Sequence, residues 1–134
     1  MFLGIGQVEF VEFLGLTTMS QIRDSNVVDI LLWLLRQRQR FRVEGISMLP
    51  LLQQGDEVLV NRRAYRRSLP SVEDVVVVWS PEQPDIRLLK RVISIHQSGA
   101  CFLQGDNPSR SRDSRRFGWV EPHLILGRVT SRFL

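Results

Sequence analysis

Short apolar runs alternate with turn signals from residue 41 to the end of the chain. Turn-forming residues stand between several of these runs, as in Gly55-Asp56, Ser80-Pro81 and Gly105-Asp106-Asn107, and such residues typically end strands. No strand-and-helix alternation is present, so a parallel sheet with crossover helices is not expected. The pattern predicts a mainly β domain over residues 41–134, with strands within residues 41–45, 57–61, 74–79, 87–95, 101–104 and 124–133.

The pattern before residue 41 is helical. Asn26 can cap a helix N-terminus, and Asp29 lies near the positive end of the helix dipole. A helix is therefore predicted over VVDILLWLLRQRQ, residues 27–39. Its apolar residues lie nearly all round, which fits a helix packed on the core, a helix on a membrane surface or a helix that binds a partner. Residues 1–24 are apolar with interspersed acids, and we treat residues 1–40 as an N-terminal arm and helix.

Composition excludes several kinds of site. The 134 residues contain one cysteine and two histidines, so neither an internal disulfide nor a structural metal is expected. The net charge of +4 comes mostly from arginine clusters at residues 36–42, 62–67 and 110–116. Solvated faces are the ordinary explanation of such clusters, with nucleic acid and anionic lipid as the alternative partners. We expect no nucleic-acid partner.

Membrane and export signals are weak along the chain. Charged residues interrupt the apolar N-terminal third, so no run reaches the roughly 18 residues of a membrane span. A basic start followed by an uninterrupted apolar segment is also missing, so no cleaved signal peptide is expected. We predict a cytoplasmic protein without a transmembrane anchor, for which peripheral membrane contact stays open.

Lys90 is the only lysine among 18 basic residues, and it lies inside the apolar run IRLLKRVISI. In a strand, Leu88, Lys90 and Val92 point to one face, so the amine has apolar neighbours on both sides. Burial drives a lysine toward its neutral form, whereas arginine stays charged in proteins. A position that requires a neutral amine therefore explains the single lysine, although a snorkelling lysine on an edge strand would also fit.

A neutral lysine can act as a general base for a nearby hydroxyl. The best candidate is Ser47, on the Ser-Met-Leu-Pro turn between two predicted strands, with Pro50 stiffening the far side. A third segment, residues 104–122, contains Ser111 near the predicted amine and an Asp113–Arg115 pair. Each segment alone also fits an ordinary turn or polar loop.

Together the three segments resemble the boxes of the signal-peptidase type of Ser/Lys serine protease. The boxes here are GISMLP, LKRV and GDNPSRSRDSR, in the family's order, and the resemblance covers about residues 41–130. It implies an antiparallel β fold with a short N-terminal helix. It also implies a serine endopeptidase that needs no cofactor or metal and acts on a protein substrate.

The resemblance also implies roles for individual residues. Ser47 is similar in position to the nucleophile, Lys90 to the general base and Ser111 to the hydroxyl that orients the lysine. Asp113 and Arg115 resemble the ion pair that holds this region together. The remaining implied positions form the oxyanion and substrate-binding region around the Ser47 N–H and comprise Gly45, Met48 and Pro50.

A finer resemblance concerns the substrate. VEGISMLPLL, GDEVLV, LQGDNP and GRVTSRF look like the maturation proteases of nickel-containing superoxide dismutase. This resemblance implies removal of the N-terminal leader of the dismutase precursor. The alternatives are processing of secretory preproteins in the manner of signal peptidase I, another Ser/Lys processing enzyme such as a self-cleaving repressor, and a basic module without enzymatic activity that binds nucleic acid.

Overall fold

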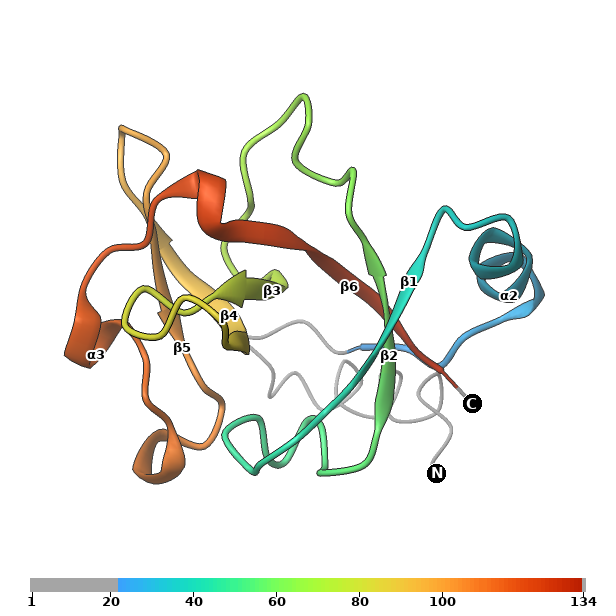
Figure 1. Cartoon of the computed structure of the whole chain (residues 1–134), viewed down its shortest axis with the longest axis horizontal. Helices are drawn as coiled ribbons and strands as arrows, with labels where there is room; N and C mark the ends of the chain where they lie inside the picture. The colour runs from blue at the N-terminus through green and yellow to red at the C-terminus, as the bar shows by residue number, and fades with distance from the viewer. Residues whose placement is uncertain (1–21, 134) are drawn as a thin grey trace, which may run out of the picture.

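The computed structural model describes residues 22–133 and shows one six-stranded sheet with short helices around it (Figure 1). The strand order is β1-β2-β6-β3-β4-β5, and all neighbouring strands are antiparallel. The elements are α2 (Val27–Leu34), β1 (Gln39–Arg42), β2 (Glu57–Asn61), β3 (Val75–Trp79), β4 (Arg87–Ile95), β5 (Cys101–Gln104), η1 (Pro108–Arg110), α3 (Ser114–Phe117), η2 (Pro122–Leu124) and β6 (Ile125–Phe133).

The mainly β prediction is confirmed, and the strands lie where the apolar runs indicated. Strands β2, β4 and β5 have the predicted bounds, and β3 and β6 each begin one residue later than predicted. Strand β1 begins two residues earlier than predicted, at Gln39, and ends at Arg42. The predicted arm of residues 1–24 lies mostly outside the described residues, and the division at residue 40 stays a prediction.

The predicted helix begins correctly but is too long. The Asn26 side chain accepts a hydrogen bond from Asp29 N, and the Asp29 carboxylate accepts one from Asn26 N, which completes a capping box. The helix ends at Leu34, and Arg36 has a left-handed φ of 64°. The prediction that the helix reaches Gln39 was wrong, because Gln39–Arg42 pairs with β2 as an edge strand.

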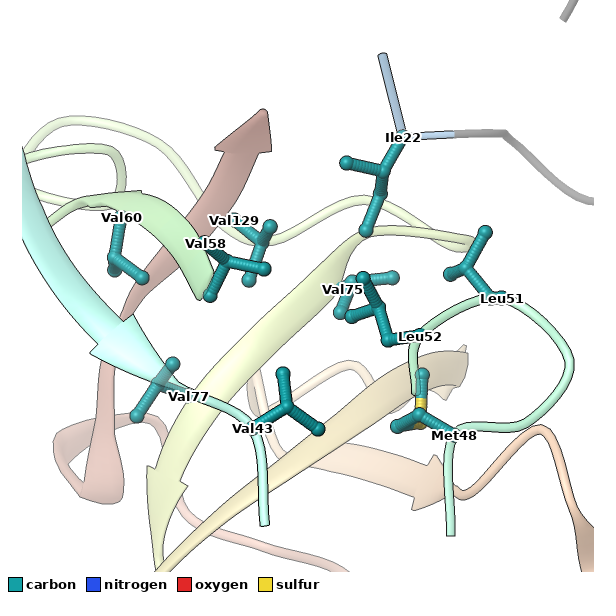
Figure 2. Packing of buried hydrophobic residues seen from close by; sticks show 10 residues of the cluster. All are labelled: Ile22, Val43, Met48, Leu51, Leu52, Val58, Val60, Val75, Val77 and Val129. Atoms are coloured by element: carbon teal, nitrogen blue, oxygen red, sulfur yellow. The ribbon is translucent and has the colours of Figure 1, made fainter. Parts of the chain in front are cut away.

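Strand β3 is buried on both faces and separates two core clusters. Val75 and Val77 pack into the first cluster, and Val76 and Val78 pack into the second. Alternate residues of a strand point to opposite faces, so a run of four valines fills both sides. The first cluster comprises Ile22, Val43, Met48, Leu51, Leu52, Val58, Val60, Val75, Val77 and Val129 (Figure 2). The second comprises Val76, Val78, Val92, Cys101, Leu103 and Val120.

Strand β1 and the first part of β4 each have an edge that remains available for further pairing. Strand β1 ends the sheet on one side, and only β2 pairs with it among the described residues. Strand β4 pairs with β5 only from Arg91 onward, so residues 87–90 have a strand partner on the β3 side alone within residues 22–133. Unpaired strand edges can accept an added strand.

Within residues 22–133, no helix combines the length and the apolar character that crossing a bilayer requires. The predicted cytoplasmic location is untested by this finding and stays a prediction.

Candidate active site

Ser47 lies on a tight turn directly after β1. Gly45, with φ of 78°, redirects the chain before the turn, and the Leu49–Pro50 peptide that follows Ser47 is cis. Met48 is 1% exposed and packs into the first core cluster with Leu52 (Figure 2). Neighbouring core residues therefore anchor the turn, while Ser47 itself is only half-buried.

The loop at residues 105–107 holds the backbone of this turn. Asn107 N donates to Ser47 O at 2.8 Å, and Asn107 Nδ2 donates to Ile46 O at 3.0 Å. A Cβ atom at Gly105 would lie 2.6 Å from Ser47 O and 2.2 Å from Ser111 Oγ. Only glycine fits at this close approach, which brings the Ser47 turn and Ser111 together.

Lys90 is buried, as the sequence predicted. Its exposed fraction is 3%, and Val76 is its partner across the strand pair. Its Nζ donates a hydrogen bond to Ser111 Oγ at 3.1 Å. Burial lowers the pKa of the Lys90 ammonium; the Asp113 carboxylate opposes this shift, and the Arg115 charge adds to it.

Ser111 has all its hydrogen-bonding capacity in use. Its hydroxyl donates to Asp113 Oδ2 at 2.7 Å and accepts from Gly105 N and Lys90 Nζ, each at 3.1 Å. A serine hydroxyl has one proton and two lone pairs, so these three bonds saturate it. Because the proton goes to Asp113, Ser111 can only accept from the lysine.

The predicted Asp113–Arg115 ion pair is present. Arg115 donates to both Asp113 oxygens, at 2.9 and 2.7 Å, and Asp113 also caps α3 and accepts from Gly105 N. Burial alone would raise the pKa of the Asp113 carboxyl, but the bonds from Arg115, Ser111 and Gly105 outweigh it and hold the pKa well below its usual range. Asp113 therefore stays ionised and fixes Ser111.

A buried ion pair between Arg91 and Asp106 was missed by sequence reasoning. Arg91 donates to both oxygens of Asp106, at 2.9 Å each, and the two side chains are 1% and 6% exposed. This pair joins the residue after Lys90 to the loop that holds Ser47. The sequence signal for it was the pair of motifs Lys-Arg and Gly-Asp-Asn, which contain Arg91 and Asp106.

Ser47 and Lys90 line the same cleft, which has a volume of about 530 Å³. Strand β1 contributes Phe41 and Arg42 to its wall, and the start of β4 contributes Leu88 and Leu89. Among residues 22–133, neither Ser47 Oγ nor Ser47 N has a hydrogen-bond partner. Of the predicted binding residues, Met48 lines the cleft, whereas Gly45 and Pro50 are exposed on the turn and do not line it.

A family model described as signal peptidase, peptidase S26, matches residues 25–96, more than half of the chain. The chain belongs to this family. The matched residues include Ser47 and Lys90 and stop before the loop that contains Ser111 and Asp113.

Curated relatives of this signal peptidase family member point the same way. The mitochondrial ATP-independent inner membrane protease subunit 1b of Arabidopsis thaliana is 36% identical over 110 residues, covering 66% of this chain and 65% of the relative. The mitochondrial inner membrane protease subunit 2 of Danio rerio is 34% identical over 110 residues, covering 66% and 60%. A probable signal peptidase I-1 of Synechocystis is 25% identical over 130 residues, covering 65% and 66%. The chain thus spans less than two thirds of the first two relatives.

These relatives support the broad resemblance and leave the finer one untested. They are proteases named for the mitochondrial inner membrane and signal peptidases I. They favour general leader processing over the dismutase-specific function that the sequence first suggested.

Proposed function

We propose that this chain is a serine endopeptidase that removes N-terminal leaders from precursor proteins, with Ser47 as nucleophile and Lys90 as general base. One observation carries the proposal: a buried lysine, held by Ser111, lines the same cleft as Ser47, whose hydroxyl has no hydrogen-bond partner among residues 22–133. A nucleophile beside a base that a third group orients is the arrangement expected for covalent catalysis.

The hydrogen bonds leave the lysine lone pair available. A neutral amine has two protons and one lone pair, and one proton of Lys90 is donated to Ser111. Because Ser111 gives its own proton to Asp113, it does not occupy the lone pair. That lone pair can accept the Ser47 proton when substrate closes the contact, since such catalytic hydrogen bonds often tighten only in the complex.

The reaction then follows from these groups. Ser47 Oγ attacks the scissile carbonyl while Lys90 takes its proton, and the Lys90 ammonium protonates the leaving amine as the peptide bond breaks. This step leaves an acyl ester on Ser47. In deacylation, a water molecule gives a proton to neutral Lys90 while its oxygen attacks the ester carbonyl. The Lys90 ammonium then returns this proton to Ser47 Oγ as the ester bond breaks, which releases the carboxylic acid and regenerates the Ser47 hydroxyl.

The Ser47 N–H is the first oxyanion donor in this proposal, because it has no described acceptor and belongs to the attacking residue. A single such donor stabilises the transition state by about 3 kcal/mol. Gly45 has no side-chain donor, so a second oxyanion donor would have to be a backbone N–H or a group from another part of the chain.

An extended substrate fits between the two available strand edges. β1 and residues 87–90 both line the cleft, and each has an edge without a strand partner among residues 22–133. A peptide between them can form main-chain hydrogen bonds like those of an added strand. Its scissile carbonyl would then lie beside Ser47 and Lys90.

The substrate class is the narrower part of the proposal. The named relatives favour general leader peptides, whereas the motifs LQGDNP and GRVTSRF support a nickel superoxide dismutase precursor. The site geometry is common to both, so the two substrates have to be compared directly.

The test is co-expression of the full chain with a nickel superoxide dismutase precursor and, separately, with a secretory preprotein. The new N-termini are then identified by intact-mass measurement. The wild type should cleave one of the two, and Ser47→Ala should abolish cleavage with the fold intact. Lys90→Arg should also abolish it, because the charge is retained but no neutral base is available.

Substantial cleavage by Lys90→Arg would remove Lys90 as the base. Cleavage of the dismutase precursor alone would establish the narrower substrate. Cleavage of the secretory preprotein would establish general processing, and cleavage of neither would contradict the peptidase proposal.

A further inference from the structure

A hollow rich in arginine lies where the chain passes from α2 into β1. It has a volume of about 340 Å³. Gln39 pairs with Val60 across β1 and β2, so the residues that precede β1 lie beside those that follow β2. The lining of this arginine hollow comprises Trp33, Arg36, Gln37, Arg38, Gln39, Arg40, Arg62 and Arg63.

Little negative charge offsets the arginines of the hollow. Among residues 22–133, no carboxylate belongs to its walls. Glu57 is already paired with Arg40, and the buried Asp29 is held by Arg23, whose Nη2 lies 2.8 Å from Asp29 Oδ1. Neither acid therefore neutralises the remaining guanidinium groups of the hollow.

The contacts of the other arginines are with neutral groups. Arg62 donates to the Gln39 side chain at 3.0 Å, and Arg38 donates to the Gln37 carbonyl at 3.0 Å. Arg38 Nε is buried and has no hydrogen-bond partner in the part of the chain that the structure describes. Guanidinium groups form their strongest hydrogen bonds with anionic oxygens, so the hollow is suited to an anionic ligand.

The hollow opens directly onto the cleft that contains Ser47. Gln39 and Arg40 line both of them, and the cleft follows β1 from Gln39 to Glu44. From Gly45 back to Gln39 an extended chain covers about 20 Å, at roughly 3.3 Å per residue. A substrate strand that starts beside Ser47 and follows the free edge of β1 would therefore reach the hollow after about six residues.

We propose that the arginine hollow is a second binding site for the substrate and holds an acidic segment of the precursor, about six to eight residues from the scissile bond. This inference rests on the proposed peptidase function. Aspartate and glutamate side chains would pair with the free guanidinium groups. The lining shared with the cleft favours an acidic stretch of the substrate over a nucleic acid, which would use the charge but not the continuity with the cleft.

Such a site acts on substrate binding and not on the chemical step. The hollow lies far from the reacting carbonyl, so its ion pairs stabilise the bound substrate and the transition state equally. Uniform binding of this kind lowers KM and leaves kcat unchanged. The expected signature of the hollow is therefore a KM effect that depends on acidic residues in the substrate.

The first test uses the precursor that the wild type cleaves in the co-expression experiment. Three consecutive glutamates are placed six to eight residues from the scissile bond, in the leader or in the mature part, and each version is matched by one with three glutamines. Glutamates on one of the two sides should lower KM about tenfold against the glutamine version, with kcat unchanged. Added salt should remove this difference, because the ion pairs are close to solvent.

Variants of the hollow should remove the same effect. Arg38→Gln with Arg63→Gln should raise KM for the glutamate precursor about tenfold, at about threefold for each ion pair lost, and should leave KM for the glutamine precursor unchanged. Arg66→Gln with Arg67→Gln is the matched control. It removes the same charge from the same loop, at exposed positions that do not line the hollow, and should raise KM less than about twofold.

A charge reversal separates recognition from damage to the fold. Arg38→Glu with Arg63→Glu should reverse the preference, so that a precursor with three lysines at the same positions has a lower KM than the glutamate version. Loss of folded protein would lower the rate for all precursors alike and could not produce this reversal.

A binding measurement keeps the outcome separate from that of the peptidase proposal. Calorimetric titration of the full chain with hexaglutamate should show binding that hexaglutamine lacks. The Arg38→Gln, Arg63→Gln variant should lose about tenfold in affinity, and the Arg66→Gln, Arg67→Gln control should retain it. If no precursor is cleaved but this pattern is found, the peptidase proposal fails while the hollow remains a site for acidic peptides.

Several outcomes would overturn the inference. Equal KM values for the glutamate and glutamine precursors on both sides of the scissile bond would exclude a role in substrate binding. Equal losses in the two arginine variants would show that overall charge acts and not the hollow. Binding of a short DNA duplex without binding of hexaglutamate would assign the hollow to nucleic acid.

Discussion

At the scale of single residues, the site depends on a chain of hydrogen bonds from residue 90 through Ser111 to Asp113. Only a lysine at residue 90 can both donate to Ser111 and become neutral. Asp113 is held ionised, Ser111 gives its proton to Asp113, and Lys90 gives a proton to Ser111. Burial favours neutral Lys90, whose remaining lone pair is then available to a substrate-bound serine. An arginine at this position would stay protonated at every accessible pH.

The pH dependence of cleavage follows from this order. Because burial lowers the pKa of Lys90, the neutral form is populated at lower pH than for a free lysine. The kcat/KM for a leader peptide should therefore rise with pH through a single deprotonation, with its midpoint below the ordinary lysine value of about 10.4. A rate that rises only through the ordinary lysine range would contradict a buried base.

At the scale of elements, β4 supplies two different functions from adjacent residues. Lys90 faces Ser111, and Arg91, on the other face, pairs with Asp106. The loop containing Asp106 also holds Ser47 through Asn107 N. The strand with the proposed base is therefore braced against the turn with the proposed nucleophile.

Breaking this brace should be costly. Asp106→Asn leaves the guanidinium of Arg91, which is 1% exposed, without its full counter-charge. We expect a loss of about 3 kcal/mol or more in the free energy of unfolding, measured by urea denaturation. Cleavage should fall as well, because the loop positions Ser47.

A matched control is available at the surface. Glu82→Gln removes a carboxylate from the exposed pair with Arg112 and should cost less than about 1 kcal/mol. Equal losses in Asp106→Asn and Glu82→Gln would show that the buried pair has no special contribution.

At the scale of the whole molecule, the two core clusters share β3. Val75 and Val77 face one cluster, and Val76 and Val78 face the other. Neither cluster can lose its packing without exposing part of a strand that the other requires. The described domain should therefore unfold as one cooperative unit.

Truncations in either cluster test this coupling. Leu52→Ala and Leu103→Ala, at two fully buried positions, should each cost roughly 2–5 kcal/mol. Calorimetry should show one transition for the wild type and both variants, and the intrinsic fluorescence of the three tryptophans should report the same midpoint. Two transitions, or a fluorescence midpoint that differs from the calorimetric one, would show that the clusters unfold separately.

Much of the fold and several site residues could be predicted from sequence because they depend on local periodicity and chemistry. Apolar runs with turn residues between them located all six strands, and the solitary lysine in an apolar run predicted a buried amine. The end of the helix could not be located in this way, because the whole segment VVDILLWLLRQRQ has a helical pattern. Only the tertiary structure shows that the helix ends at Leu34 and that Gln39 pairs with β2.

The sequence by itself determined where the strands lie, and it favoured a buried Lys90 and an Asp113–Arg115 pair. Tertiary structure alone decided how these parts meet. Residues far apart in the chain converge because Gly105 lets the loop approach Ser47 and Ser111, and because Arg91 pairs with Asp106. The exposed face of α2, which includes Val27, Val28 and Leu31, was also decided at this level, because the helix is apolar nearly all round and only its packing on the sheet selects the buried face.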